Sequence, residues 1–246
     1  MRVFIICLIC GFSAQMIDGT LGMAYGVSCS SLLQSLGIPS AMSSFCVHTA
    51  EIFTSFFSGI SHFTMKNFDK KLFLSLIIPG VLGGILGAYI LTNIDDSVIS
   101  PLISAYLIIM GVIIIAKAFS KKKRAARKIG AGVYPLALIG GFSDSLGGGG
   151  WGPVVTSTLA ASDCDLRKTI GSVNAAEFFV TLAESVTFFF TIGSLGDAFP
   201  AVLGLIFGGM LASPIAAYLC KKLPLKPLMI VVGVLIVTVN TFKLVG

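Results

Sequence analysis

The sequence carries very little charge for its length. Charged residues make up 11% of its 246 residues and hydrophobic residues 55%, whereas an ordinary soluble domain has roughly 25% charged residues. The mean hydropathy is +0.97. Because a water-soluble core cannot bury so many apolar side chains, the composition excludes an ordinary soluble domain and indicates an integral membrane protein.

Groups for catalysis and metal binding are also scarce. The chain has only two histidines, His48 and His62, and no Ser-His-Asp arrangement accompanies them, which argues against a membrane-embedded enzyme. The six cysteines show neither metal-ligand spacing nor a disulfide framework, and most lie in apolar runs where cysteine behaves as a small hydrophobe. We therefore expect no enzymatic activity, no metal and no cofactor.

Apolar runs divide the chain at lengths that suit a bilayer. About 20 residues cross the hydrocarbon layer at a helical rise of about 1.5 Å per residue. The sequence therefore predicts an all-α membrane protein with about eight hydrophobic segments. These runs cover residues 3–36, 45–63, 72–91, 98–118, 132–161, 170–192, 199–219 and 228–245.

One motif occurs twice in the chain. The segment Asp-Gly-Thr-Leu-Gly-Met-Ala-Tyr-Gly at 18–26 returns as Asp-Ser-Leu-Gly-Gly-Gly-Gly-Trp-Gly at 144–152, and Glu51 returns as Glu177. Both matches have the same offset of 126 residues. We therefore predict a duplicated membrane domain, with a first repeat at 1–120, a basic cytoplasmic linker at 121–131 and a second repeat at 132–246.

Loop charges indicate that the two repeats have opposite orientations. In the first repeat a loop with three lysines and one aspartate (66–71) precedes a loop with two aspartates (95–96). In the second repeat the corresponding loops carry one aspartate and then three lysines. Because lysine and arginine near membrane segments favour the cytoplasm, equivalent loops should face opposite sides, as in inverted-repeat transporters. The basic linker is expected to be an orientation signal, with no nucleic-acid partner.

The first run of each repeat is expected to break near the middle of the membrane. The glycines at 147–150, followed by Gly152 and Pro153, disfavour a continuous helix, and symmetry places a break at Gly19 to Gly26. Irregular backbone at that depth is tolerated only when it is buried in protein or lines a cavity. The alternative explanation is close helix packing through the two G-x-x-x-G pairs.

Further duplicated motifs carry a family resemblance. Gly-Phe-Ser opens each copy at 11–13 and 141–143, a glycine-rich segment follows, and Gly-Gly stretches come later at 83–88 and 208–213. In this order the motifs resemble the sulfite exporter TauE/SafE family of prokaryotic membrane transporters. The resemblance implies a multi-pass protein of the cytoplasmic membrane that moves small sulfur-containing or organic anions, of the sulfite, thiosulfate or sulfoacetate type.

The broken runs are the predicted anion site. A helix start offers unpaired N–H groups and a positive dipole end. No lysine or arginine lies at the centre of a run, so hydroxyls and amides would complete the site, with Tyr25 and Trp151 as walls or gates. The candidate substrate-binding residues are Ser13, Gln15, Asp18, Gly19, Thr20, Gly22, Tyr25, Ser143, Asp144, Ser145, Gly148, Gly149, Trp151 and Asn174.

Polar residues share one face of the second run and one face of the sixth, which must look inward in hydrocarbon. His48, Glu51 and Glu177 on these faces are candidates for coupling to a proton or a cation. Alternatively, the two glutamates are neutral acids that fix the fold and His48 is a core histidine. The two faces are Ser44, His48, Glu51 and Ser55, and Asn174, Glu177, Thr181 and Glu184.

A cation carrier is the alternative function. Oxygen ligands from Asp18, Glu51, Asp144 and Glu177 would suit a hard cation. Under either interpretation the partners are a small substrate and the lipid bilayer, and homo-oligomerisation stays open.

Overall fold

The structure is a computed structural model that describes residues 2–119, 130–148, 150–160, 166–219 and 225–245. Helices are the only regular elements within these ranges. The helices of the first half are α1 (Arg2–Leu21), α2 (Tyr25–Ser35), α3 (Ser40–Thr64), α4 (Lys70–Thr92) and α5 (Asp96–Phe119). The second half contains η1 (Gly130–Gly132), α6 (Val133–Gly147), η2 (Trp151–Thr156), α7 (Ser157–Ala160), α8 (Leu166–Ile192), η3 (Gly196–Ala198), α9 (Phe199–Leu219) and α10 (Leu225–Val245).

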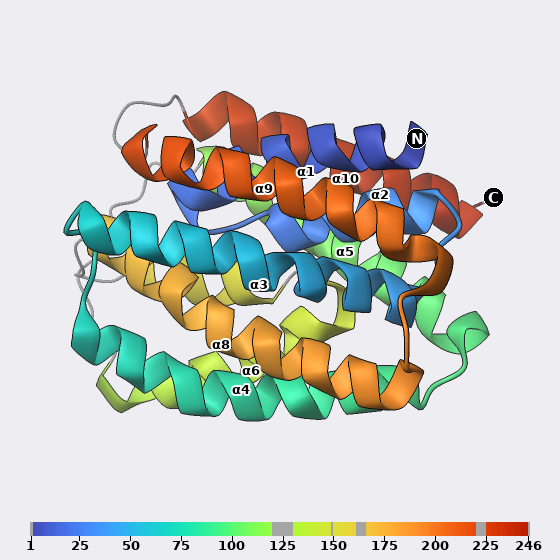
Figure 1. The fold of residues 1–246 in the computed structure, drawn as a ribbon, viewed down its shortest axis with the longest axis horizontal. Coiled ribbons are helices and arrows are strands. Elements are labelled where there is room, and N and C mark those ends of the chain that lie inside the picture. Colours follow the sequence, from blue (N-terminus) through green and yellow to red (C-terminus); the bar gives the residue numbers. More distant parts are fainter. Residues whose placement is uncertain (1, 120–129, 149, 161–165, 220–224, 246) are drawn as a thin grey trace.

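The long helices lie side by side along the longest axis of the molecule, and both chain ends lie at the same end of the bundle (Figure 1). Helices of one half pack mainly on helices of the other: α1 on α9, α6 on α4, α3 on α8 and α5 on α10. Each half therefore depends on the other for burial of its helix faces, and the two form one bundle.

Equivalent helices of the two halves run in opposite directions. His48 and Ser58 of α3 contact Glu184 and Asn174 of α8, an order that makes α3 and α8 antiparallel. Figure 1 shows the same opposition for α4 and α9. In each of these two pairs, the helix from the first half runs in the opposite direction to the helix from the second half.

Both predicted breaks are present. The first run splits into α1 and α2 around residues 22–24, and the fifth splits after α6 into the π-helical η2 and the short α7. Val3 at the start of α1 and Leu36 after the end of α2 line one common cavity, so the first run turns back to the end where it began. A straight spanning helix would have separated these two residues by the full thickness of the bundle.

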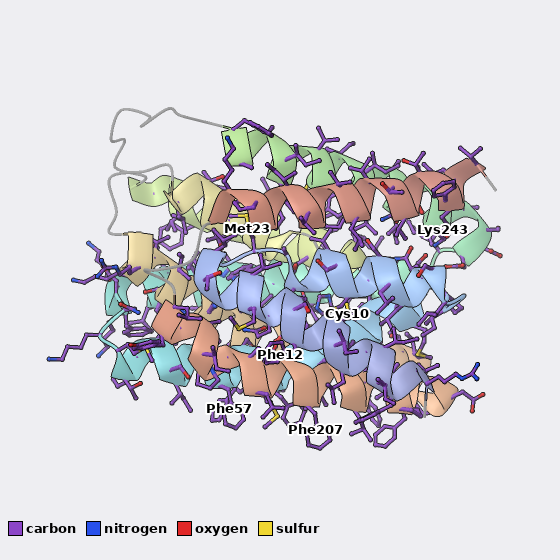
Figure 2. The ribbon with its side chains drawn as sticks, turned by 90° about the horizontal axis from the view of Figure 1, so that it is seen from above. Cys10, Phe12, Met23, Phe57, Phe207 and Lys243 are labelled. Atoms are coloured by element: carbon purple, nitrogen blue, oxygen red, sulfur yellow. The ribbon has the colours of Figure 1, made fainter. Side chains whose placement is uncertain are left out.

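The outer surface of the bundle is apolar. Phe57 of α3 and Phe207 of α9 point away from the bundle (Figure 2) and are 38% and 49% exposed. Five helices of the described residues are long and apolar enough to cross a membrane: those within 2–21, 70–92, 96–116, 167–192 and 196–219. The 25-residue α3 is long enough but carries many polar residues, which it turns inward. The predicted all-α, multi-pass membrane fold is confirmed.

Candidate functional site

The two helix breaks begin with the same backbone geometry. Gly22 and Gly148 adopt left-handed φ angles of 68° and 67°, which favour glycine because it lacks a Cβ. Each donates its N–H over 2.5 Å to the carbonyl oxygen four residues earlier, on Asp18 and Asp144 respectively. The matched aspartates therefore sit in the last turn of α1 and α6, directly before the chain breaks.

The breaks cross each other in direct backbone contact. A Cβ on Gly26 would collide with the carbonyl of Gly148, and a Cβ on Gly152 would collide with Met23. Both members of each G-x-x-x-G pair thus serve close packing, as the alternative explanation proposed, while the helices also break as expected. All four glycines are buried, so the crossing lies inside the bundle.

Asp144 occupies the helix start that follows its own break. Its Oδ1 accepts hydrogen bonds from the backbone N–H groups of Gly150 (3.1 Å) and Trp151 (3.0 Å). In the first half Asp18 lies beside the backbone amide of Tyr25 in the same way. The amides expected to face a substrate anion are therefore engaged by the protein's own carboxylates.

An acidic cluster with one histidine lies beside this crossing. His48 Nδ1 is 2.8 Å from Glu51 Oε2 and 3.3 Å from Glu184 Oε2. Ligand atoms of His48, Glu51 and Asp144 all lie within 4.8 Å of one another. Every one of these side chains is buried, and no lysine or arginine is buried among the described side chains.

The symmetry-related positions, 126 residues away in the chain, carry different side chains. Asn174 takes the place of His48 and donates through Nδ2 to Ser58 Oγ over 2.8 Å, and Ser58 takes the place of Glu184. Glu177, the counterpart of Glu51, is also buried. The clustered acid and base groups, two from each half, therefore gather at only one of the two symmetry-related positions.

Several buried donors near the breaks have no hydrogen-bond partner among the described residues. These include Gln15 Nε2, one turn before Gly19, and Thr156 Oγ1. A Cβ on Gly22 would lie 3.2 Å from that hydroxyl, so Thr156 stands directly at the first break. Unpaired buried donors are costly, and these two are free to bind a ligand.

The two aromatic residues of the motif are buried anchors. Tyr25 donates from its hydroxyl to the carbonyl of Leu205 over 3.1 Å, and Trp151 donates from Nε1 to the carbonyl of Val173, also over 3.1 Å. Both side chains are buried. Tyr25 thus ties the first break to α9 of the other half, whereas Trp151 ties the second break to α8 of its own half.

The other predicted site residues divide between the crossing and its surroundings. Thr20 bonds carbonyls of its own helix, Gly19 accepts from His62 Nε2, and Ser145 bonds the Phe142 carbonyl. Ser143 is half-buried, whereas Ser13 is exposed on α1 and lies outside the buried site. Gly149 lies outside the described residues.

Sequence reasoning about the site omitted Glu184 and Thr156. Glu184 was on the predicted polar face of the sixth run but has no acidic counterpart in the first half, so the repeat did not select it. Its position seven residues after Glu177, two helical turns along the same face, was the available signal. Thr156 could not be selected from the sequence, because its place at the site depends on the packing of η2 against Gly22.

Two apolar grooves flank the α3–α8 seam. One, of about 900 Å³, includes Phe45, Thr49 and Ser185, and the other, of about 230 Å³, includes Ser55 and Gly59. The first begins one residue from His48 and Glu184, and the second begins one turn beyond Glu51. The buried cluster thus lies between grooves that approach from opposite ends of the seam.

Comparisons with known proteins agree with this architecture. The family model described as sulfite exporter TauE/SafE matches residues 7–242. The probable membrane transporter protein YtnM of Bacillus subtilis (strain 168) is 37% identical over 252 residues, which cover 100% of this chain and 84% of that protein. No solved structure gives a significant match.

Proposed function

The chain belongs to the sulfite exporter TauE/SafE family and is a membrane transporter, and from this premise we propose that it is a secondary transporter of small sulfur-containing or organic anions. Sulfite, thiosulfate and sulfoacetate represent the proposed substrate class. The observation that carries the proposal is the crossing of two broken helices at a buried, polar centre. In membrane transporters, irregular backbone at such depth lines a substrate or ion site.

The anion site is proposed on the side of the first break. Gln15 Nε2 and Thr156 Oγ1 are buried donors without partners among the described residues, and the Thr156 side chain packs directly against Gly22. Neutral donors suit a carrier because a transported ion must be released as well as bound. Asn174 belongs to the proposed site through its amide, which now donates to Ser58.

Such a site requires that negative charge be neutralised when the anion binds. Among the residues that the structure describes, five carboxylic side chains are buried: Asp18, Glu51, Asp144, Glu177 and Glu184. A second negative group beside ionised carboxylates in a medium of low dielectric is strongly unfavourable. We therefore propose that the anion moves together with a proton or a cation, with His48, Glu51 and Glu177 as coupling residues.

The proposed transport route follows the pseudo-symmetry of the bundle. Inverted repeats can exchange conformations and so open a central site to either side. The two grooves at opposite ends of the antiparallel α3–α8 seam support this proposal as candidate entrances. The central cluster would be reached through one groove at a time.

Anion uptake into proteoliposomes tests this function. The purified chain should exchange radiolabelled sulfite, thiosulfate or sulfoacetate against an internal pool of the same anion. Thr156→Val keeps the volume but removes the hydroxyl, and it should weaken anion affinity roughly tenfold because a hydrogen bond to a charged group is lost. Thr191→Val, on the exposed side of α8, is the matched control and should behave like the wild type.

In vesicles loaded without the anion, Glu177→Gln should abolish net uptake while the variant still inserts and purifies, because the amide keeps the volume but loses the acid. Failure to exchange any of the three anions would reject the proposed substrate class. Unchanged affinity of Thr156→Val would move the anion site away from the first break.

A cation carrier is the second candidate, because all five buried acids could serve as ligands. Under this alternative, cation flux would proceed at the same rate without any of the anions. Measuring cation uptake with and without thiosulfate therefore separates the two functions.

A further inference from the structure

We infer that His48, Glu51, Asp144 and Glu184 form a buried binding site for one divalent transition-metal ion. The sequence alone predicted no metal site, and neither the family nor the bacterial relative is described as holding one. The metal site shares His48 and Glu51 with the proposed coupling residues but uses neither of the proposed anion donors, Gln15 and Thr156. Only the claim that this ion accompanies the anion rests on the proposed function.

The four side chains come from three helices: ligand atoms of His48, Glu51 and Asp144 lie within 4.8 Å of one another, and Glu184 joins them through His48. His48 and Glu51 are one turn apart on α3, Glu184 comes from α8, and Asp144 comes from the last turn of α6. His48 Nδ1 lies between Glu51 Oε2 at 2.8 Å and Glu184 Oε2 at 3.3 Å. Because α3, α6 and α8 are all long, packed helices, the ligand set is held on rigid elements.

Atoms without partners point to an ion in this cluster. Glu184 has a fully buried side chain, yet neither of its carboxylate oxygens finds a hydrogen-bond donor among the described residues. Asp144 Oδ2 also lacks a partner there. A folded protein rarely leaves so many acceptors unsatisfied in one place, and a cation would satisfy the carboxylates together.

Asp144 is already oriented as a metal ligand. Its Oδ1 is fixed by the N–H groups of Gly150 and Trp151, which leaves Oδ2 as the oxygen available to an ion. Hydrogen bonds of this kind orient ligands in established metal sites. The break in the fifth run thus positions one carboxylate at the cluster.

The donor set selects the class of ion. Imidazole nitrogen favours zinc and other transition metals, whereas carboxylate oxygen is shared by these ions and by calcium and magnesium. One nitrogen with three carboxylates therefore fits a divalent first-row transition metal better than an alkali ion. A divalent charge would also offset most of the charge of three carboxylates, where no lysine or arginine is buried among the described side chains.

The symmetry-related position lacks part of the ligand set. Asn174 and Ser58 stand where the first cluster has His48 and Glu184, and they bond each other over 2.8 Å. That side therefore lacks two of the four ligands. We expect one ion per chain, bound only at the symmetry-related position that contains His48.

Metal content of the full-length protein in detergent tests the site. After treatment with EDTA, the protein is dialysed against Zn²⁺ or Mn²⁺ and analysed by elemental mass spectrometry, with Mn²⁺ also followed by electron paramagnetic resonance. About one ion per chain should be retained, as expected for a closed four-ligand site. Ca²⁺ and Na⁺ in excess should not displace it.

Two substitutions copy residues that the fold accepts at the equivalent positions of the other half. His48→Asn and Glu184→Ser should each weaken metal binding by at least about tenfold, because each removes a ligand. His62→Asn is the matched control: His62 is the other buried histidine but contacts Gly19 and Asn67 instead, so its metal content should equal that of the wild type.

Three results would overturn the inference. These are a wild type that retains neither Zn²⁺ nor Mn²⁺ above the detergent blank, equal retention by all three variants, and preferential binding of Ca²⁺ or Na⁺ that ignores His48→Asn. If the variants fail to fold, the metal content of the wild type alone still tests whether the site binds an ion. Anion exchange that continues in EDTA would support the transport proposal and reject a metal requirement for transport. Metal binding without anion exchange would support the metal site and reject the proposed anion transport.

Discussion

At the scale of single residues, glycines at and near the two breaks differ in backbone conformation and in the space around them. Gly148 has a left-handed φ and touches Gly26, so it is constrained by conformation and by space. Gly147 next to it is helical, and an added Cβ there would lie 3.3 Å from Ile103 Cγ2 and 3.5 Å from Leu107 Cδ2. Gly37 has a left-handed φ of 84° but no atom within 4 Å of an added Cβ.

These differences predict a graded series of alanine substitutions. Gly37→Ala should cost about 1–2 kcal/mol from the left-handed conformation alone, and Gly148→Ala should cost more because the methyl group also collides with backbone. Gly147→Ala should change stability least. Thermal unfolding of the purified protein in detergent would measure the series, and equal melting temperatures for Gly147→Ala and Gly148→Ala would contradict the described break.

Because of this packing, alanine at Gly148 cannot separate an anion-binding role from a structural role. A loss of binding would follow from either cause. Thr156→Val is the cleaner probe of the anion, since it removes one hydroxyl without adding an atom to the crossing.

At the scale of helices, two seams repeat the same contact in the two halves. A Cβ on Gly83 of α4 would strike the carbonyl of Leu138 and the amide of Phe142, and a Cβ on Gly208 of α9 would strike the carbonyl of Leu8 and the amide of Phe12. Small residues let helix backbones approach closely where lipid offers no hydrophobic driving force. The duplicated Gly-Gly stretches therefore join each half to the other.

Gly83→Ala and Gly208→Ala should destabilise the bundle by similar amounts, about 1–3 kcal/mol each, as overpacking of a tight contact does. Leu82→Ala is the control beside the seam, because Leu82 is 57% exposed and should tolerate the change. Melting temperatures in detergent would compare all three. A large effect at only one of the two glycines would show that the seams are not equivalent.

The helices and both breaks could be predicted from the sequence because apolar length and clustered glycines act locally. The inward polar faces of α3 and α8 were also predictable, since a charged face toward lipid is excluded, and the burial of His48, Glu51 and Glu177 confirms it. The convergence of Glu184 on His48 was not predictable. It depends on the crossing of antiparallel helices far apart in the chain, which no local pattern encodes.

At the scale of the whole molecule, the arrangement sorts the described loops by charge. The acidic loops at 95–96 and 197 lie at the end of the bundle that holds both termini, and the basic loop at 66–71 lies at the opposite end (Figure 1). The basic linker itself lies mostly outside the described residues. The described loops are therefore basic at one end of the bundle and acidic at the other.

The charge difference between the two ends predicts the orientation in the membrane. Lysine and arginine favour the cytoplasm, so the end with Lys70 should be inside, and the end with Asp95 and both termini should be outside. In a background without native cysteines, an impermeant maleimide added to intact cells should label Asp95→Cys and Asp197→Cys. Lys70→Cys should react only after the cells are permeabilised. Labelling of Lys70→Cys in intact cells, with Asp95→Cys protected, would reverse the orientation. Opposite results for Asp95→Cys and Asp197→Cys would contradict the inverted repeat itself, because these two loops share one end of the bundle only if equivalent helices run in opposite directions.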